Sequence, residues 1–371
     1  MKGYFIHFNA RDTVGVSSKI DMQIKEFTKF HDIKEVDIKI SDKNFIRNAM
    51  SVLPYVSICW DYTEAYRLID RPDFLYIRKV GGDYKHYKFL RFVKKQFPKC
   101  KILIEIPTYP YFWESVKNIT GILLVKDYYN YCYKMKKYID RIVTYSDDTE
   151  IFGIPTLHIK NGIDVESILP IDVYAEYSLE RVNLIAVAVM RPHHGYERII
   201  EGLYRYYRNK GKRDFHIHMV GDGIERNAYE KLIHEYKLES HFTFYGMLSG
   251  NELHEVYCKA DFALSAFGWY KDRVSKSSAL KVREYLAKGL PIISGCREDA
   301  FDETKGEFCE IFSNDNSPID FNRIVSFYER IYRDYDRKQV IENVREFART
   351  HIDNCVTMRP IMEYIAENEK V

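Results

Sequence analysis

The chain contains a segment whose residue types could bind a phosphate group. Residues 277–295 read SSALKVREYLAKGLPIISG, which predicts a helix that stops at Gly289 and a short apolar strand after it. Lys281 and Glu284 are three positions apart and therefore share one helix face. The ammonium can reach a phosphate, and the carboxylate, further in, can accept hydrogen bonds from a ribose diol. The same spacing suits a solvated ion pair, so the pattern alone leaves both interpretations open.

The start of this helix could contribute further groups. Ser277 and Ser278 are predicted N-caps. The N–H groups of Ala279 and Leu280 would lie in the first turn, where the helix dipole stabilises an anion. Apolar side chains are expected to fill its buried side: Leu280, Leu286 and Ala287.

A second loop with phosphate-binding potential reads RPHHGYER and begins at Arg191. It lies between an apolar strand pattern and a helical pattern. In α/β folds, phosphates bind at the carboxyl end of a strand, facing the next helix. Arg191 would supply a permanent charge and His194 a hydrogen bond. A surface loop with ordinary histidines is the alternative, and the position favours the functional interpretation.

Two glycine-containing loops also follow strand patterns. Gly221 and Gly223 could let the backbone approach a ligand at a helix N-terminus, or simply form a tight turn. A dinucleotide fingerprint would need a third glycine where Arg226 stands, so an NAD site is disfavoured. Near the N-terminus, Gly15 and Val16 belong to a loop that suits a close approach to a ligand.

A carboxylate also stands at the end of a predicted strand in the segment EIPTYPY. Glu105 is followed by a proline-stiffened aromatic loop that contains Thr108 and Tyr109. This combination suits a sugar or acceptor site, and a proline-rich turn is the alternative.

The composition indicates a globular protein of two domains. The 371 residues exceed one ordinary core, and hydrophobic residues make up 46% and charged residues 30%. The net charge of +2 indicates no partner by itself. The seven cysteines include no CxxC pair, so reduced thiols and no zinc site are expected. MKGYFIHFNARD lacks the apolar core of a signal peptide, and no apolar run approaches the ~18 residues of a membrane span.

The charge is concentrated in one part of the chain. Between Arg78 and Lys101, nine basic residues accompany a single acid, Asp83, and aromatic residues are interleaved with them. Such a segment can face nucleic acid or an anionic membrane surface. A lysine-rich outer helix face is an equally good interpretation.

Short apolar runs alternate with helical patterns throughout, which predicts parallel sheets covered on both faces. Strands are expected over 4–8, 36–40, 74–77, 102–106, 141–144, 156–159, 184–189, 216–220, 242–245, 262–265 and 290–294. Helices are expected over 18–30, 84–97, 120–138, 197–208, 225–236, 251–258, 278–288, 327–335, 338–350 and 356–367. A polar stretch with an Asn-Gly turn at 160–180 is the predicted domain boundary.

Taken in order, several segments resemble a known family. They are GVSSKI, NGID at 161–164, AVAVMRPHHGYERIIEGL, IHMVGDG, FTFYGMLSGNELHEVYCKADFALS and ALKVREYLAKGLPIISG. The chain resembles a retaining family 4 glycosyltransferase of the GT-B type, in particular bacterial capsular and surface-polysaccharide glycosyltransferases. The resemblance spans nearly the whole chain and is strongest over 182–295.

The resemblance implies the GT-B architecture, in which two Rossmann-like, doubly wound α/β domains face a cleft. Residues 1–162 would form an acceptor-binding domain, to which a C-terminal helix, 355–371, returns. Residues 163–354 would form the domain that binds the nucleotide-sugar donor.

The resemblance also assigns roles to residues. Arg191 stands near the family's diphosphate-binding arginine, and His194 occupies the place where lysine is usual. Lys281 would supply the missing ammonium, and Glu284 would bind the ribose. The family has a glutamate where this chain has Ser277, so the usual contact to the donor sugar is in doubt; Asp272 is a weak substitute.

The remaining roles follow from the same resemblance. Gly15 would approach the diphosphate, and the base would lie against 242–247. Arg191 and Lys281 are the expected catalytic groups, and Glu105 would position the acceptor. Asp147 and Asp148 are expected to cap a helix, and no metal is expected.

The resemblance therefore implies a metal-independent enzyme that moves a hexose-type sugar, with retention, in surface polysaccharide synthesis. The substrate would be a nucleoside-diphosphate sugar, with UDP slightly favoured, and no cofactor is expected. The acceptor would be a saccharide or lipid-linked. A cytoplasmic protein is expected, peripheral on the inner face of the membrane through 78–101, with no nucleic-acid partner. The alternatives are a non-hydrolysing nucleotide-sugar epimerase and a non-catalytic nucleotide-sugar-binding relative.

Overall fold

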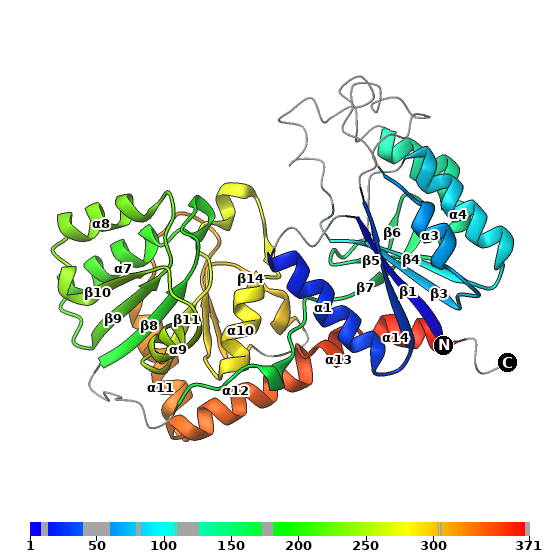
Figure 1. The fold of residues 1–371 in the computed structure, drawn as a ribbon. Helices are drawn as coiled ribbons and strands as arrows, with labels where there is room; N and C mark the ends of the chain where they lie inside the picture. Colours follow the sequence, from blue (N-terminus) through cyan, green and yellow to red (C-terminus); the bar gives the residue numbers. More distant parts are fainter. Residues whose placement is uncertain are drawn as a thin grey trace. The chain divides into compact units, whose positions relative to one another are not determined.

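The fold was analysed in a computed structural model of the chain (Figure 1). The residues that the structure describes are 1–8, 14–39, 60–78, 83–107, 109, 126–172, 181–302, 304 and 306–367. The chain forms two compact units, Met1–Ile159 with Thr357–Val371, and Lys160–Val356. These limits fall close to the predicted ends at 162 and 355, while the acceptor and donor roles of the two domains stay predictions.

The first unit is built on a seven-stranded sheet with the order β2-β1-β3-β4-β5-β7-β6. Its strands are β1 (Lys2–Phe8), β2 (Asp32–Ile38), β3 (Phe74–Arg78), β4 (Lys101–Ile106), β5 (Arg141–Thr144), β6 (Glu150–Ile151) and β7 (Ile154–His158). Neighbouring strands are parallel except β6 and β7. Every residue of β3 and β4 is buried, as expected for central parallel strands covered on both faces.

Helices cover both faces of this sheet. They are α1 (Val14–Thr28), α3 (Thr63–Leu68), α4 (Tyr84–Gln96), the π-helix η2 (Asn130–Met135), the 3₁₀ helix η3 (Lys136–Tyr138) and α14 (Arg359–Ala366). One apolar layer joins two helices to the sheet through residues such as Phe27 and Ile361. These helices are α1, drawn in blue in Figure 1, and α14, drawn in red. The other joins α3, α4 and η2 through residues such as Phe89 and Met135.

The second unit contains a six-stranded parallel sheet with the order β10-β9-β8-β11-β13-β15. Its strands are β8 (Arg181–Val187), β9 (Asp214–Val220), β10 (Phe242–Gly246), β11 (Phe262–Leu264), β13 (Ile292–Ser294) and β15 (Cys309–Ile311). Two short strands, β12 (Lys276–Ser277) and β14 (Arg297–Glu298), pair in parallel outside it. Its main helices are α7 (Glu197–Arg208), α8 (Arg226–Glu235), α9 (Gly250–Cys258), α10 (Leu280–Lys288), α11 (Phe321–Tyr332) and α12 (Arg337–His351); α13 (Asn354–Thr357) follows.

The strand order of each sheet reverses at one point. In the first unit the chain moves from β1 to β2 on one side and from β3 to β5 on the other. In the second unit the reversal lies between β8 and β11. Loops at the carboxyl ends of the strands diverge at such a point, and ligands of doubly wound sheets bind there. The predicted parallel, doubly wound fold is confirmed in both units.

Some local predictions were wrong. The N-cap of α10 is Ala279, without a side-chain hydrogen bond, and Ser277 lies in β12. Asp147 and Asp148 precede β6 and cap no helix. Leu280 is 43% exposed, because it stands in the first turn of α10 beyond the core, whereas Leu286 and Ala287 are buried as predicted. In the part of the chain that the structure describes, no helix is long and apolar enough to cross a membrane.

Candidate functional site

Lys281 of α10 lies at the reversal point of the second sheet. Its Nζ donates to the Tyr196 hydroxyl at 3.2 Å and to the Ser265 carbonyl at 2.9 Å. Burial lowers the pKa of Lys281 to about 7, although the charge of Glu298 opposes the shift. Among the described residues, no ion pair joins Lys281 to Glu284, so the alternative of a solvated surface pair is excluded.

Glu284 and Tyr285 fix the next part of the same helix. Glu284 accepts a hydrogen bond of 3.2 Å from the Tyr257 hydroxyl on α9. The Tyr285 hydroxyl accepts from the backbone N–H of Val187 at 2.9 Å and donates to its carbonyl at 3.2 Å. Because Val187 is the last residue of β8, this contact holds α10 against the carboxyl end of the sheet.

Arg283 of α10 is fully buried. Its guanidinium pairs with Asp299 and donates to the Asn161 carbonyl at 2.9 Å. The Asn161 amide donates to the Ser278 carbonyl at 2.8 Å, and the Ser278 hydroxyl donates to Asp299 at 2.7 Å. The Asn-Gly segment at the domain boundary is therefore tied to the start of α10 through Arg283.

The predicted phosphate loop after β8 contains the 3₁₀ helix η5 (Pro192–His194). The backbone N–H of Arg191 donates to Nδ1 of His194 at 3.1 Å. The neutral imidazole must therefore carry its proton on Nε2, which makes that nitrogen a donor. Burial and the charge of Lys281 lower the pKa of His194 to about 3, so the ring is neutral at physiological pH.

The structure brings Arg191, His194 and Lys281 together. Both cations lower the pKa of His194, and the imidazole stacks on the Tyr196 ring at 5.6 Å between centroids. The Tyr196 hydroxyl also receives the Lys281 hydrogen bond. The Arg191 side chain is exposed, so one permanent cation, one buried ammonium and one neutral N–H donor meet at this edge of the sheet.

Glycines allow the loops of this site to pack closely. Gly195 has a left-handed φ of 62°, and a Cβ there would lie 2.4 Å from the backbone nitrogen of Gly268. A Cβ on Gly221 or Gly223 would meet the carbonyl oxygens of Ala188 and Met190 at 1.9 and 2.3 Å. These two glycines are thus required by the packing of their own loop, and their predicted contact with a donor stays a prediction.

A buried carboxylate that the sequence did not single out lies beside Lys281. Glu298 of β14 is fully buried, and its Oε1 accepts from the hydroxyls of Ser265 at 2.6 Å and Ser294 at 2.8 Å. Burial raises the pKa of Glu298, although the serine hydrogen bonds oppose the shift. The segment that contains Glu298 matches no motif. The one sequence signal for this residue is its position shortly after the predicted strand of GLPIISG.

Glu105 in the first unit is the centre of another buried cluster. Its carboxylate accepts from the hydroxyls of Tyr145 at 2.9 Å and Tyr76 at 3.0 Å, and from the Gln23 amide at 3.2 Å. Arg78 at 3.3 Å and Lys19 at 3.7 Å complete its ion pairs.

Both oxygens of Glu105 are occupied by protein groups, so a role toward an acceptor would act through its partners. Burial raises the pKa of Glu105, but Arg78, Lys19 and the hydrogen bonds outweigh this effect and hold it below its usual value. The cluster lies where β3 and β4 end, next to α1.

The structure describes fewer contacts for the other predicted site residues of the first unit. Gly15 and Val16 lie in the first turn of α1 and not in a loop before it. Tyr109 packs on the Phe152 ring at 6.4 Å between centroids, and Thr108 lies outside the described residues. Among the residues that the structure does describe, no group of three or more His, Cys, Asp or Glu side chains could hold a metal ion. Metal independence stays a prediction.

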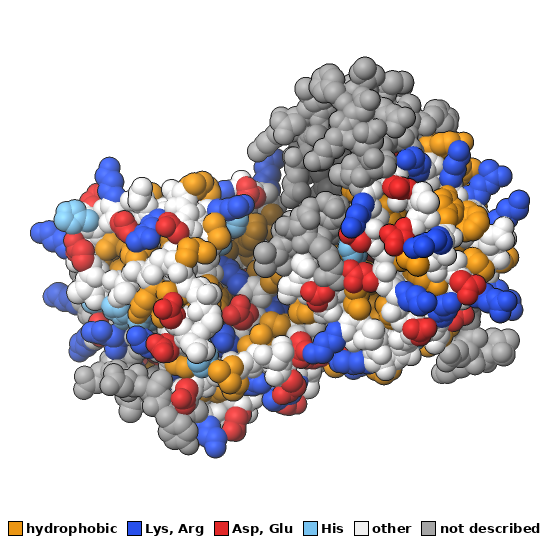
Figure 2. Space-filling view, viewed as in Figure 1, with side chains coloured by type: hydrophobic (Ala, Val, Ile, Leu, Met, Phe, Trp, Pro, Cys, Tyr) orange, Lys and Arg blue, Asp and Glu red, His pale blue; other side chains and the backbone are white. Residues whose placement is uncertain are grey.

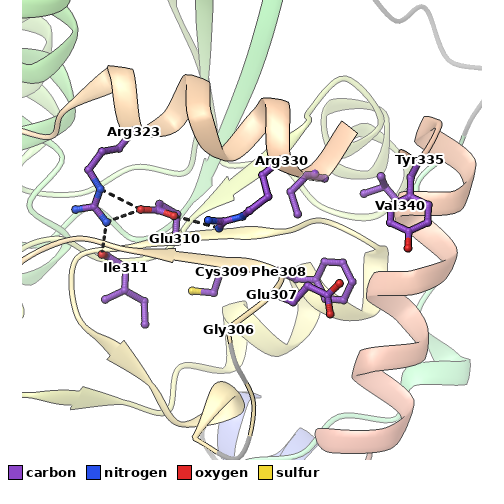
Figure 3. A pocket seen from close by; sticks show the side chains of 11 residues that line it. Gly306, Glu307, Phe308, Cys309, Glu310, Ile311, Arg323, Arg330, Tyr335 and Val340 are labelled. Atoms are coloured by element: carbon purple, nitrogen blue, oxygen red, sulfur yellow. Dashed lines mark hydrogen bonds and ion pairs between the residues drawn. The ribbon is translucent and has the colours of Figure 1, made fainter. Parts of the chain in front are cut away.

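The second unit also has a cavity of about 710 Å³ between β15, α11 and α12 (Figure 3). On its wall, Arg323 and Arg330 of α11 flank Glu310 of β15, and Arg330 pairs with it at 3.2 Å. None of the predicted site residues lines this cavity.

A comparison with protein families finds a match within the second unit. Residues 178–347 match the family model described as "Glycosyl transferases group 1". The match includes Arg191, His194, Lys281 and Glu298. No curated protein matches the chain at a significant level.

Solved structures resemble the whole chain. A glycosyltransferase from Rickettsia africae has 14% identity and a TM-score of 0.62, covering 100% of this chain and 98% of its own. HepE of Anabaena in complex with UDP has 10% identity and a TM-score of 0.61, covering 99% and 100%. The lipopolysaccharide outer core galactosyltransferase WaaB has 15% identity and a TM-score of 0.60, covering 99% and 100%. At such identities the likeness shows the fold, which is GT-B. Together with the group 1 domain, it supports a GT-B glycosyltransferase.

Proposed function

We propose that the protein transfers a hexose-type sugar from a nucleoside-diphosphate sugar to a saccharide or lipid-linked acceptor. The observation that carries the proposal is the convergence of Arg191, His194 and Lys281 at the reversal point of the group 1 domain. These groups are two cations and a neutral donor, which suit a diphosphate.

Leaving-group stabilisation is the proposed source of catalysis. When the bond between sugar and phosphate breaks, negative charge grows on the diphosphate. Lys281, Arg191 and the His194 Nε2–H would stabilise that charge, together with the N–H groups of Ala279 and Leu280. The burial of Lys281 strengthens this effect, because a charge interacts more strongly where water is excluded. Glu284 would accept the ribose hydroxyls.

UDP is the nucleotide that we propose first. The HepE structure was obtained with UDP, and HepE shares the fold of this chain. At the carboxyl ends of β9 and β10, Ile224 and Met247 are 78% and 69% exposed, and such apolar side chains suit the flat face of a base. Retention, independence of metal and a role in surface polysaccharide synthesis are part of the proposal; WaaB, a lipopolysaccharide enzyme, supports the last.

The experiment that tests the proposal measures turnover of a panel of UDP-, GDP-, ADP- and dTDP-sugars with and without saccharide acceptors. Transfer, or slow release of free sugar without acceptor, is the expected result. An epimerised sugar nucleotide would indicate an epimerase, and binding without turnover a non-catalytic relative. If no nucleotide sugar is bound or turned over, the proposed function is wrong.

We also propose that the first unit rests on an anionic membrane surface, where a lipid-linked acceptor would lie. Lys88, Arg91 and Lys95 of α4 are exposed, and Figure 2 shows basic side chains gathered over α4 beside hydrophobic ones. Tyr133 of η2 is 73% exposed, and the neighbouring Lys134 lies over the Tyr84 ring of α4 at 5.8 Å. Exposed lysines and tyrosines are typical of surfaces that bind lipid headgroups.

Not every lysine of the predicted segment 78–101 is available for this contact. Lys94 pairs with Asp140 at 2.6 Å, and Lys101 donates to the Ile365 carbonyl at 3.0 Å. Residues 79–82 lie outside the described part of the chain. The surface is therefore best tested at Lys88, Arg91 and Lys95.

Sedimentation with phosphatidylglycerol vesicles at low salt tests the membrane proposal. Replacing Lys88, Arg91 and Lys95 by Glu should abolish binding, because each basic residue near such a surface contributes about 1 kcal/mol. A matched variant reverses three exposed lysines of the second unit, Lys212, Lys231 and Lys338. If both variants bind like the wild type, or both lose binding equally, the surface does not act as proposed.

A further inference from the structure

Two buried polar atoms beside Lys281 lack a well-formed hydrogen bond. Within the described part of the chain, neither Oε2 of Glu298 nor Oγ of Ser277 makes a hydrogen bond of normal geometry. Ser277 is 3% exposed and Glu298 is fully buried. A buried polar group without a partner costs roughly 1–3 kcal/mol, so such groups commonly mark a site whose partner is a ligand.

The two atoms belong to neighbouring backbone positions. Ser277 of β12 and Glu298 of β14 are register partners in the parallel ladder. Neighbouring strands lie about 4.8 Å apart, so their side chains emerge side by side on the same face. The Ser277 hydroxyl acts as a hydrogen-bond donor that lowers the pKa of Glu298, so it lies close to the carboxylate, although the contact falls short of normal hydrogen-bond geometry.

The positions that follow in both strands are fixed by other contacts. The Ser278 hydroxyl donates to Asp299 at 2.7 Å, and the buried guanidinium of Arg283 pairs with Asp299. Side chains alternate along extended backbone, so these contacts leave Ser277 and Glu298 on the opposite face. These contacts hold the ladder in place, so Ser277 and Glu298 stay together on its other face.

The carboxylate is held in one orientation by its other oxygen. Oε1 accepts from Ser265 at 2.6 Å and from Ser294 at 2.8 Å, which leaves Oε2 as the free acceptor. Ser265 also connects this group to Lys281, because its carbonyl accepts the 2.9 Å bond from the Lys281 ammonium. An ammonium has three donors, and two of them are used by Ser265 and Tyr196.

The free groups beside the proposed phosphate site are thus a carboxylate oxygen, a hydroxyl and one ammonium N–H. This set is complementary to a hydroxyl-bearing group attached to a phosphate. A carboxylate oxygen accepts from one sugar hydroxyl, a serine hydroxyl can donate or accept, and the ammonium binds a phosphate oxygen.

We propose that Glu298 and Ser277 form the subsite that binds the hydroxyl groups of the donor sugar, with Oε2 of Glu298 as the principal acceptor. The proposal rests on the proposed function and specifies which residues distinguish a nucleotide sugar from its nucleoside diphosphate. It assigns the sugar contact to β14 and the phosphate contact to α10.

Calorimetry with paired ligands tests this assignment. The ligands are UDP, GDP, ADP and dTDP and the corresponding glucose conjugates, with galactose and mannose conjugates of the nucleotide that binds. Glu298→Gln should weaken binding of the preferred nucleotide sugar at least tenfold and leave the affinity for its diphosphate within about twofold. A hydrogen bond to a charged group contributes roughly 1.5–3 kcal/mol, which corresponds to about 10- to 150-fold.

Two further variants separate a sugar contact from a structural role. Ser277→Ala should weaken binding of the nucleotide sugar about threefold, with an unchanged affinity for the diphosphate. The double variant S277E/E298Q moves the carboxylate across the ladder and should recover part of the affinity for the sugar. The control is Glu310→Gln, which removes a carboxylate on the wall of the cavity in Figure 3, elsewhere in the same unit. It should leave the affinity for both the diphosphate and the nucleotide sugar unchanged.

The outcomes that overturn the inference differ from those that overturn the function. Equal losses for diphosphate and nucleotide sugar in Glu298→Gln would show a structural role. Unchanged binding of both, in this variant and in Ser277→Ala, would exclude a sugar contact. If Glu298→Gln does not fold, Ser277→Ala carries the test alone, and the absence of a loss specific to the nucleotide sugar in that variant overturns the inference. Failure of the wild type to bind any of the ligands would overturn the proposed function itself.

Discussion

Each unit of the molecule has a fully buried glutamate where parallel strands end, and the two glutamates differ in their hydrogen bonds. Glu105 in the first unit accepts hydrogen bonds on both oxygens and pairs with Arg78 and Lys19. Glu298 in the second unit has one oxygen held by two serines, and no hydrogen bond of normal geometry from the described residues reaches the other oxygen. The pKa of Glu105 is lowered and that of Glu298 is raised. The fold therefore stabilises the charged form of Glu105 and destabilises the charged form of Glu298.

The difference separates a carboxylate whose oxygens are all bound by protein groups from one that has an oxygen without a well-formed hydrogen bond. A carboxylate whose lone pairs are all used stabilises the fold and offers nothing to bind. A buried carboxylate that is held through only one of its oxygens destabilises the free protein. A ligand that donates a hydrogen bond to the other oxygen removes this cost. The same residue type at the same edge of a sheet can therefore serve opposite purposes.

Replacing Glu105 by Gln should have the largest effect on stability. The change leaves Arg78 and Lys19 without their counter-charge in a buried place, and breaking such a pair costs about 3–5 kcal/mol. Urea unfolding monitored by tryptophan fluorescence measures the loss. Tyr145→Phe removes one hydrogen bond from the same cluster and should cost only about 1 kcal/mol. A loss below 1 kcal/mol for Glu105→Gln would contradict the contrast between the two carboxylates.

Replacing Lys281 by Met should have the largest effect on catalysis. Loss of one group that stabilises leaving-group charge costs about 10²- to 10³-fold in kcat. Stability should not fall, because the ammonium is desolvated and its pKa is lowered to about 7. Lys288→Met is the matched control, since Lys288 is buried on the same helix and donates to the Leu169 carbonyl at 3.4 Å. A similar kcat for both variants would refute the role of Lys281.

Binding of the diphosphate should depend on pH through Lys281. Its pKa is about 7 in the free protein, and a bound anion raises it. The complex therefore binds more protons than the free protein above pH 7, and affinity falls as pH rises, by at most tenfold per unit. His194, with a pKa of about 3, stays neutral in this range. Calorimetric titrations from pH 7 to 9 measure the slope, and Lys281→Arg should flatten it. A steep slope in that variant would assign the titration to another group.

Replacing Glu298 by Gln should have the smallest effect on stability, and of the opposite sign. Its raised pKa means that the charged form is unfavourable in the fold, so Glu298→Gln should leave the free energy of unfolding unchanged or raise it by up to about 1 kcal/mol. As the pH falls from the raised pKa of Glu298 to the pKa of an ordinary glutamate, the folded protein takes up the proton first, and its stability rises. As the pH falls from the pKa of an ordinary glutamate to the lowered pKa of Glu105, the unfolded chain takes up the proton first, and stability falls. Thermal melts of the two Gln variants between pH 3 and 6 should therefore deviate from the wild type in opposite directions. Deviations of equal sign would remove the contrast.

Much of the fold could be predicted from the sequence. The apolar runs 102–106 and 141–144 became β4 and β5 almost unchanged, and α7 has the predicted bounds 197–208. Such runs are recognisable because a strand buried on both faces is continuously apolar. α3 was missed, because TEAYRL is too short to display a helical period.

The site could be predicted only in part. Lys281, Arg191 and His194 lie in segments with the familiar order of a loop and a helix after a strand. Their surroundings could not be predicted, because the β12–β14 ladder joins residues 21 positions apart in two-residue strands without any periodic pattern. That Ser277 has Glu298 as its partner on the neighbouring strand could be seen only in three dimensions. Nothing in the sequence pattern marks Arg283 as buried, because its partner Asp299 stands 16 positions further along the chain.

The position of α14 has a consequence for the order of synthesis. Met358, Ile361 and Ile365 complete the apolar layer that covers Phe5, Tyr76 and Leu103 of the first sheet. During translation, residues 1–159 emerge first, yet one face of their sheet stays partly uncovered until the helix at 359–366 leaves the ribosome. The second unit, contiguous over 160–356, can fold in the meantime. The first unit therefore begins to fold first and finishes last, and its nascent form is the one that chaperones are expected to recognise.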